Sequence, residues 1–281
     1  MSGSWHPIHD NHAIDVMAAV VNFAEPIPEL IFKKALKVSE DVAFSKGLRS
    51  RHATQGAQVM LAVAADGSQS LVPGPSVSQG RSFNSLLELS EDQPIPNRVA
   101  EQLQVTNSYV AYRTWQYVSW TWQLARMKEL LGPSLSMANN VVFFGSQRLE
   151  YLDRFRFDGE AQSATVGDVL RPGSERLAPH IFSRTDLWHS HTGAYRTDDG
   201  ATKKLEQIHV DAVDDPIIGP SSTRWINLMT AREDRFNDRE VDQNVDGVFA
   251  NFDIMHGELI EILASVVTPG IADRIYLKGT E

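Results

Sequence analysis

The stretch NNVVFFGSQRLEYLDRFRFD, residues 139–158, decides the fold, because its side chains alternate in character with a period of two. Strict alternation is typical of a strand with one buried face and one solvated face. The stretch therefore predicts a long strand in an antiparallel sheet that is covered on one side only. The apolar odd positions are Leu149, Tyr151, Phe155 and Phe157, and the charged even positions are Arg148, Glu150, Arg154 and Arg156.

Further strands are expected on both sides of this one. Apolar and β-branched residues gather in runs that are bounded by turn-forming residues, the pattern of β-strands. One pair of runs turns at Asn107-Ser108. The predicted strands cover about 12–24, 56–65, 80–89, 98–113, 182–196, 203–213 and 223–233.

Three segments have the helical spacing of apolar side chains. They are 28–46, 115–131 and 247–267. Gly47 is expected to end the first, Gly132-Pro133 the second and Thr268-Pro269-Gly270 the third. These patterns predict one α+β domain over residues 1–281, a mainly antiparallel sheet with three amphipathic helices packed on it. The order of the elements also suggests two similar halves, 1–135 and 136–281.

The composition excludes several classes of protein. The chain has 281 residues and no cysteine, which rules out disulfide scaffolds, thiolate metal sites and cysteine nucleophiles. Its net charge of −10 opposes unspecific binding to nucleic acid and to anionic membranes. The N-terminal residues lack the pattern of a signal peptide, and no apolar run approaches the roughly 20 residues that cross a bilayer. We therefore expect a soluble, cytoplasmic protein.

Several segments resemble a sporadically distributed prokaryotic family of unassigned function. Residues 149–155 are similar to its leucine, arginine, tyrosine, isoleucine, asparagine strand motif, and 109–113 and 252–260 are similar to its central strand and closing helix. Glu150 and Asp153 depart from the motif, since the family usually has arginine and asparagine there. The resemblance implies carriage on mobile elements or in defence islands, and it implies no activity, cofactor or catalytic residue.

Two predicted strands bring histidines together. His189 and His191 are two residues apart and share one strand face, and His209 and Asp211 repeat this spacing on the next strand. A hairpin centred on Gly200 would pair His191 with His209 and His189 with Asp211. The four side chains could then hold Zn²⁺ or another divalent ion and leave a position for water; the alternative is a solvated sheet face. The same register would bury Trp188, Ala194, Ile208, Val210 and Ala212 on the opposite face.

The arginines of the first strand are the second candidate site. Arg148, Arg154 and Arg156 could contact phosphates or the carboxylates of a partner. Because Glu150 lies on the same face, a charged surface strand with cross-strand ion pairs is the alternative. The run 232–235, Arg-Glu-Asp-Arg, is interpreted in the same way as a mixed surface patch.

Two other polar stretches carry weaker signals. The N-terminal histidines His6, His9 and His12 are spaced by three, but Pro7 and the terminal position favour a flexible arm over a metal site. The glycine-rich stretch 67–80 lacks the lysine and the hydroxyl residue of a phosphate-binding loop, so we expect a long, mobile hairpin there.

These observations favour a non-enzymatic binding or sensing module, an accessory or immunity-like component of a prokaryotic defence or mobile-element system. The expected partner is a protein or a second copy of the chain; nucleic acid is disfavoured and no membrane is expected. No cofactor is expected unless the histidine cluster holds a divalent metal. The alternative function is a metal-dependent hydrolase or nuclease built on His189, His191, His209 and Asp211.

Overall fold

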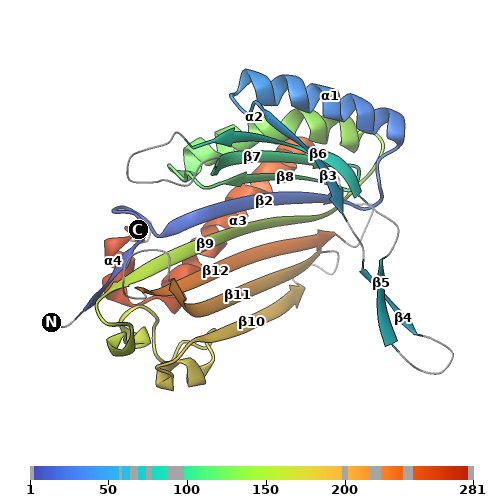
Figure 1. Cartoon of the computed structure of the whole chain (residues 1–281). Helices are drawn as coiled ribbons and strands as arrows, with labels where there is room; N and C mark the ends of the chain where they lie inside the picture. The colour runs from blue at the N-terminus through green and yellow to red at the C-terminus, as the bar shows by residue number, and fades with distance from the viewer. Residues whose placement is uncertain are drawn as a thin grey trace.

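The computed structural model describes residues 3–56, 59–63, 69–73, 78–87, 98–197, 202–215, 223–236 and 243–277. A ten-stranded sheet runs through the molecule, and every strand pair in it is antiparallel (Figure 1). Helices pack on one of its faces. The prediction of an α+β fold with a large antiparallel sheet is confirmed.

The sheet is built on one central pair of strands. Strand β2 (Ile14–Phe23) lies beside the long strand β9 (Phe144–Asp158) that the alternating stretch predicted. From β2 outward follow β8 (Tyr109–Thr114), β7 (Val99–Thr106), β6 (Ser78–Leu86) and β3 (Ser50–Gly56); from β9 outward follow β12 (Thr223–Phe236), β11 (Thr202–Asp215) and β10 (Trp188–Thr197).

The strand order follows the same rule on both sides of this pair. On each side the strand next to the centre is the last to appear in the sequence, and each strand farther out precedes its inner neighbour. Short antiparallel connections produce this order, because each strand turns back along the one before it. The similarity of the two halves stays a prediction.

The helices cover the sheet in two places. Helix α1 (Glu29–Ser45) packs on β6 and β7, and α2 (Trp120–Asn139) packs on β8 and on its neighbouring helices. Helix α3 (Val245–Val266) crosses β9 and β12, and the short α4 (Pro269–Arg274) follows it. Gly47 ends α1 as predicted, with a positive φ of 92° that glycine adopts without a steric cost.

The predicted end of the second helix was wrong. Helix α2 begins later than expected, at Trp120, where the side chain of Ser119 caps it, and it continues through Pro133 to Asn139. A proline inside a helix removes one backbone hydrogen bond. The apolar face continues beyond it, with Leu135 and Ala138 fully buried, and this burial offsets the lost hydrogen bond.

The predictions for the N-terminal part were incomplete. Residues 5–12 are not simply a flexible arm, because β1 (Ser4–Pro7) pairs with β9 and Trp5 is buried. Strand β3 was not predicted. The expected strand at 56–65 is present only as β4 (Val59–Val63), which forms a separate ladder with β5 (Gln69–Pro73) inside the predicted loop 67–80. Residues 57–58, 64–68 and 74–77 lie outside the described residues.

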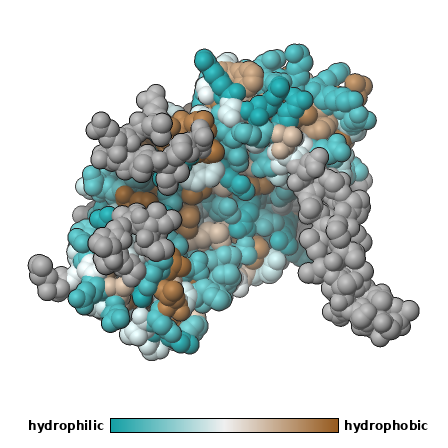
Figure 2. Space-filling view, in the orientation of Figure 1, coloured by the Kyte–Doolittle hydropathy of each residue, from teal (hydrophilic) through white to brown (hydrophobic). Residues whose placement is uncertain are grey.

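The core lies between the sheet and the helices. The odd positions of β9 point into it, and they meet buried side chains of α2 and α3 such as Leu130 and Phe252. The even positions of β9 lie on the other face, against which no helix of the described residues packs. We call this surface the open face. Figure 2 looks onto it, and its centre is mostly hydrophilic.

Candidate functional site

The histidine hairpin has the predicted register. In the β10–β11 ladder, His191 lies opposite His209 and His189 lies opposite Asp211. All four positions are on the open face, and the expected apolar side chains lie on the other. Ile208, Val210 and Ala212 are buried there, whereas Ala194, near the end of the hairpin, is exposed and was wrongly expected to be buried. The centre of the turn, 198–201, lies outside the described residues.

The histidine rings stack on one another. The centroids of His191 and His209 are 4.0 Å apart with an angle of 10° between their planes, and His189 lies 5.6 Å from His191. Burial lowers the pKa of His209, and the charges of His191 and Arg148 lower it further. Stacked rings turn their faces, not their nitrogens, toward each other. In the described part of the chain, no group of three or more His, Cys, Asp or Glu side chains is placed to hold a metal ion.

Arg148 lies in an ion-pair network at the centre of the open face. Its Nε is 2.8 Å from Glu150 Oε2, and its Nη1 is 3.5 Å from Glu233 Oε2 on the neighbouring strand. The same Nη1 donates to Gln207 Oε1 at 2.6 Å. The network is partly buried, so these charges hold one another in fixed positions. The alternative prediction, a charged strand with cross-strand ion pairs, is correct for this residue.

Arg154 is held by a different set of neighbours. Its guanidinium lies 4.3 Å from the ring centroid of Trp225, within the range of a cation–π contact. Its Nε donates to Asn227 Oδ1 at 2.9 Å, and its Nη1 is 3.3 Å from Asp15 Oδ2. Arg156, two residues farther along β9, is exposed. The three arginines therefore share one face, and only Arg156 projects into solvent.

The interpretation of residues 232–235 as one surface patch was wrong. Glu233 and Arg235 lie on the open face, but Arg232 and Asp234 point to the helix side and are buried. Arg232 is 0 % exposed, and its Nε lies 2.8 Å from Oε2 of Glu258 on α3. Alternation along β12 separates the run into two sites, because neighbouring strand residues point to opposite faces.

A buried acid, Asp153, and a half-buried histidine, His256, lie between β9 and the helices. Asp153 points into the core, and neither carboxyl oxygen has a hydrogen-bond partner among the described residues. Burial raises the pKa of Asp153 to about 7. Two residues along the same face, the hydroxyl of Tyr151 is 2.9 Å from Nδ1 of His256. Burial lowers the pKa of His256 to about 4, although the charge of Asp253 acts to raise this pKa. Both groups are therefore held in their neutral forms near pH 6.

Aromatic rings lie near both of these groups. Trp120 stacks on His256 with ring centroids 4.2 Å apart, and its indole nitrogen donates to Asp253 at 2.6 Å. Tyr117 lies 6.0 Å from Tyr151, ring to ring, and burial raises its pKa, with a smaller effect from the charge of Asp153. Sequence reasoning missed this cluster, although the interrupted apolar pattern at Asp153 was a signal.

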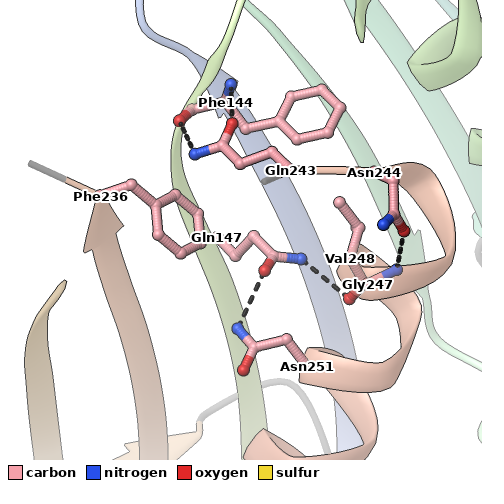
Figure 3. Close-up of a pocket in the computed structure, with 8 residues that line it drawn as sticks. All are labelled: Phe144, Gln147, Phe236, Gln243, Asn244, Gly247, Val248 and Asn251. Atoms are coloured by element: carbon pink, nitrogen blue, oxygen red, sulfur yellow. Dashed lines mark hydrogen bonds between the residues drawn. The ribbon is translucent and has the colours of Figure 1, made fainter. Parts of the chain in front are cut away.

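A pocket opens at the start of α3, and Figure 3 shows its eight lining residues. Gln243 binds the backbone of Phe144 twice, accepting from its nitrogen at 2.6 Å and donating to its oxygen at 3.0 Å. Gln147 donates to the carbonyl of Val248 at 2.9 Å and accepts from Asn251 at 2.9 Å. No lining residue is titratable, so these groups offer hydrogen bonds and apolar contacts without acid–base chemistry. No sequence pattern indicated this pocket.

The comparisons with known proteins give no further assignment. No protein-family model matches the chain, and a search of curated proteins finds no match. Within the residues that the structure describes, no helix is both long enough and apolar enough to span a bilayer.

Proposed function

We propose that the protein is a non-enzymatic binding module that holds a protein partner, or a second copy of itself, on the open face of its sheet. In line with the family resemblance, its setting is a prokaryotic defence or mobile-element system. One observation carries the proposal: the described helices all pack on one face of the ten-stranded sheet, and the other face presents polar side chains at its centre.

The polar side chains of this face are preorganised. Arg148 and Arg154 are each held by several neighbours, and Gln104 donates to the hydroxyl of Tyr109 at 2.8 Å. Side chains that are already ordered lose little conformational entropy when a partner binds. A surface of this kind favours recognition by shape and hydrogen bonding over catalysis.

Site-specific cross-linking tests the proposal, because the chain has no cysteine of its own. Leu152→Cys places a thiol at the centre of the open face, and Lys37→Cys places one on the exposed side of α1. Each variant is labelled with a photoreactive maleimide and irradiated in an extract of the native host. We expect one protein, or the chain itself, to be cross-linked from Leu152→Cys and not from Lys37→Cys. The same products from both positions, or none from the open face, would contradict the proposal.

The alternative function is a metal-dependent hydrolase or nuclease, and the confirmed register of the histidine hairpin favours it. Metal binding would require the stacked rings to turn so that their nitrogens meet at one point. We expect that, if this function is correct, the protein retains about one Zn²⁺ per chain after dialysis, measured by elemental analysis. His189→Ala with His191→Ala should then abolish retention, whereas His180→Ala, an exposed histidine elsewhere, should not. A wild-type chain without bound metal, or hydrolysis that survives chelation, would exclude it.

A further inference from the structure

We infer that the partner of the open face binds through an acidic, amphipathic protein segment. This inference rests on the proposed function of that face. It adds the chemistry of the partner. Three features of the open face support it: the exposed charges, the pairing of the acidic side chains and a row of apolar side chains.

The exposed charges of the open face are mainly basic. Among the strand residues of this face whose exposure the structure describes, Asp158 at the far end of β9 is the one exposed acid. The other exposed charged side chains are Arg113 on β8, Arg156 on β9, Lys203 on β11 and Arg235 on β12. The whole chain has a net charge of −10, so the exposed charges of this face differ in sign from the chain as a whole. Opposite charge on a partner steers it to such a surface.

Three of the remaining acids are already paired within the face, and a fourth, Asp211, is half-buried opposite His189. Glu150 and Glu233 both contact Arg148, and Asp15 contacts Arg98 at 3.4 Å as well as Arg154. These carboxylates are partly or fully buried. A partner would therefore meet the basic side chains first.

A short row of apolar side chains crosses the face between its polar groups. Val16 on β2 lies opposite Leu152 on β9, which in turn lies opposite Met229 on β12. Arg113 lies beside this row, opposite Ala18. A partner with apolar groups on one side and carboxylates at its margins would match this arrangement, as an amphipathic helix does when it binds in a groove. The apolar row and the overall negative charge both disfavour nucleic acid, whose phosphates continue along its whole length.

Fluorescence anisotropy with defined probes tests the inference. The first probe is a labelled peptide of about 20 residues, with glutamate on one helical face and leucine on the other. The second has lysine in place of glutamate, and the third is a labelled DNA duplex of similar length. We expect binding of the glutamate peptide only, and weaker binding as the salt concentration rises from about 0.05 M to about 0.3 M.

Charge reversal identifies the surface. Arg113→Glu and Arg156→Glu should each weaken binding of the glutamate peptide about threefold to tenfold. Lys34→Glu and Lys37→Glu change the charge by the same amount on the exposed side of α1 and should have little effect. Equal loss in all four variants would mean that only net charge matters and would overturn the inference. Circular dichroism confirms that each variant is folded.

Other outcomes are equally decisive. Preference for the DNA duplex would replace the inference by nucleic-acid binding, and no binding of any probe would overturn it. Failure of the inference alone is distinguishable from failure of the proposed function. If only the inference fails, Leu152→Cys still captures its partner, but adding Arg113→Glu to that variant does not reduce the capture. If the proposed function fails, nothing specific is captured.

Discussion

Replacing Asp153 by asparagine is expected to raise the free energy of unfolding by about 2 to 4 kcal/mol at about pH 8. The cause is the buried carboxyl, whose pKa rises from an ordinary value near 3.8 to about 7. Above that pH the folded protein must hold an unpaired charge in its core, and asparagine has a similar shape without the charge. Below about pH 4 the carboxyl is neutral in both states, so the variant should gain little there.

The pH dependence of the wild type has two opposing contributions. Between about pH 4 and about pH 7 the folded state holds a proton on Asp153 that the unfolded state has lost, so this residue makes stability fall as the pH rises. His256 acts in the opposite direction, because its pKa is lowered from 6.5 to about 4 and the unfolded state binds the extra proton. The two effects nearly cancel between about pH 4 and about pH 6.5. Asp153→Asn should therefore uncover a stability that rises with pH.

Urea unfolding of the wild type and Asp153→Asn at several pH values measures this difference. Asp41→Asn removes an acid from the exposed side of α1 and serves as the control, for which we expect no comparable gain. An Asp153→Asn variant whose gain does not grow with pH would show that the carboxyl is not charged in the folded core. The m-value, which is the slope of the unfolding free energy against urea concentration, should be unchanged, since the surface exposed on unfolding is the same.

Replacing Glu258 by alanine is expected to lower the free energy of unfolding by about 2 to 4 kcal/mol. Glu258 is the nearest partner of Arg232, whose side chain is 0 % exposed, while the glutamate side chain itself is 29 % exposed. Without Glu258, the ion pair that the structure describes for the buried guanidinium is the one with Asp234, where Arg232 Nε lies 3.8 Å from Asp234 Oδ1. Breaking a buried pair from one side leaves an uncompensated charge, which costs more than the pair contributes.

The matched control is Glu261→Ala, which removes an exposed glutamate three residues along α3. Its effect should stay within about 0.5 kcal/mol. Thermal unfolding followed by circular dichroism compares the two variants with the wild type. If both lose the same small amount, the ion pair between α3 and β12 does not hold the helix on the sheet.

Sequence patterns predicted the parts of the fold that follow from the spacing of side chains along one segment or one hairpin. The alternation along 144–158 gave the strand, its buried face and its charged face, since side chains on a strand point alternately to the two sides. The pairing of His191 with His209 followed from the hydrophobic pattern, because a shift by one residue would have buried the polar side chains. Gly47 was found from its position after an amphipathic run.

The rest depends on contacts between distant segments. Pro133 has a strong local preference to end a helix, and only burial of the residues beyond it explains why α2 continues. Asp153, Tyr117 and His256 are far apart in sequence, so no spacing rule connects them. The same holds for the amide groups around Gln243. Metal binding at the histidine hairpin and the family relationship remain predictions.

The central pairing of β2 with β9 also bears on folding during synthesis, because the two strands are far apart in the sequence. Strand β2 leaves the ribosome roughly 130 residues before β9, which at bacterial or eukaryotic rates is a delay of about 6 to 26 s. During that interval the edge of β2 that β9 will cover has no partner from its own chain, and an unpaired edge is a template for wrong pairing. This edge is therefore the place where wrong pairing of the nascent chain would begin, before the second half of the sheet has been synthesised.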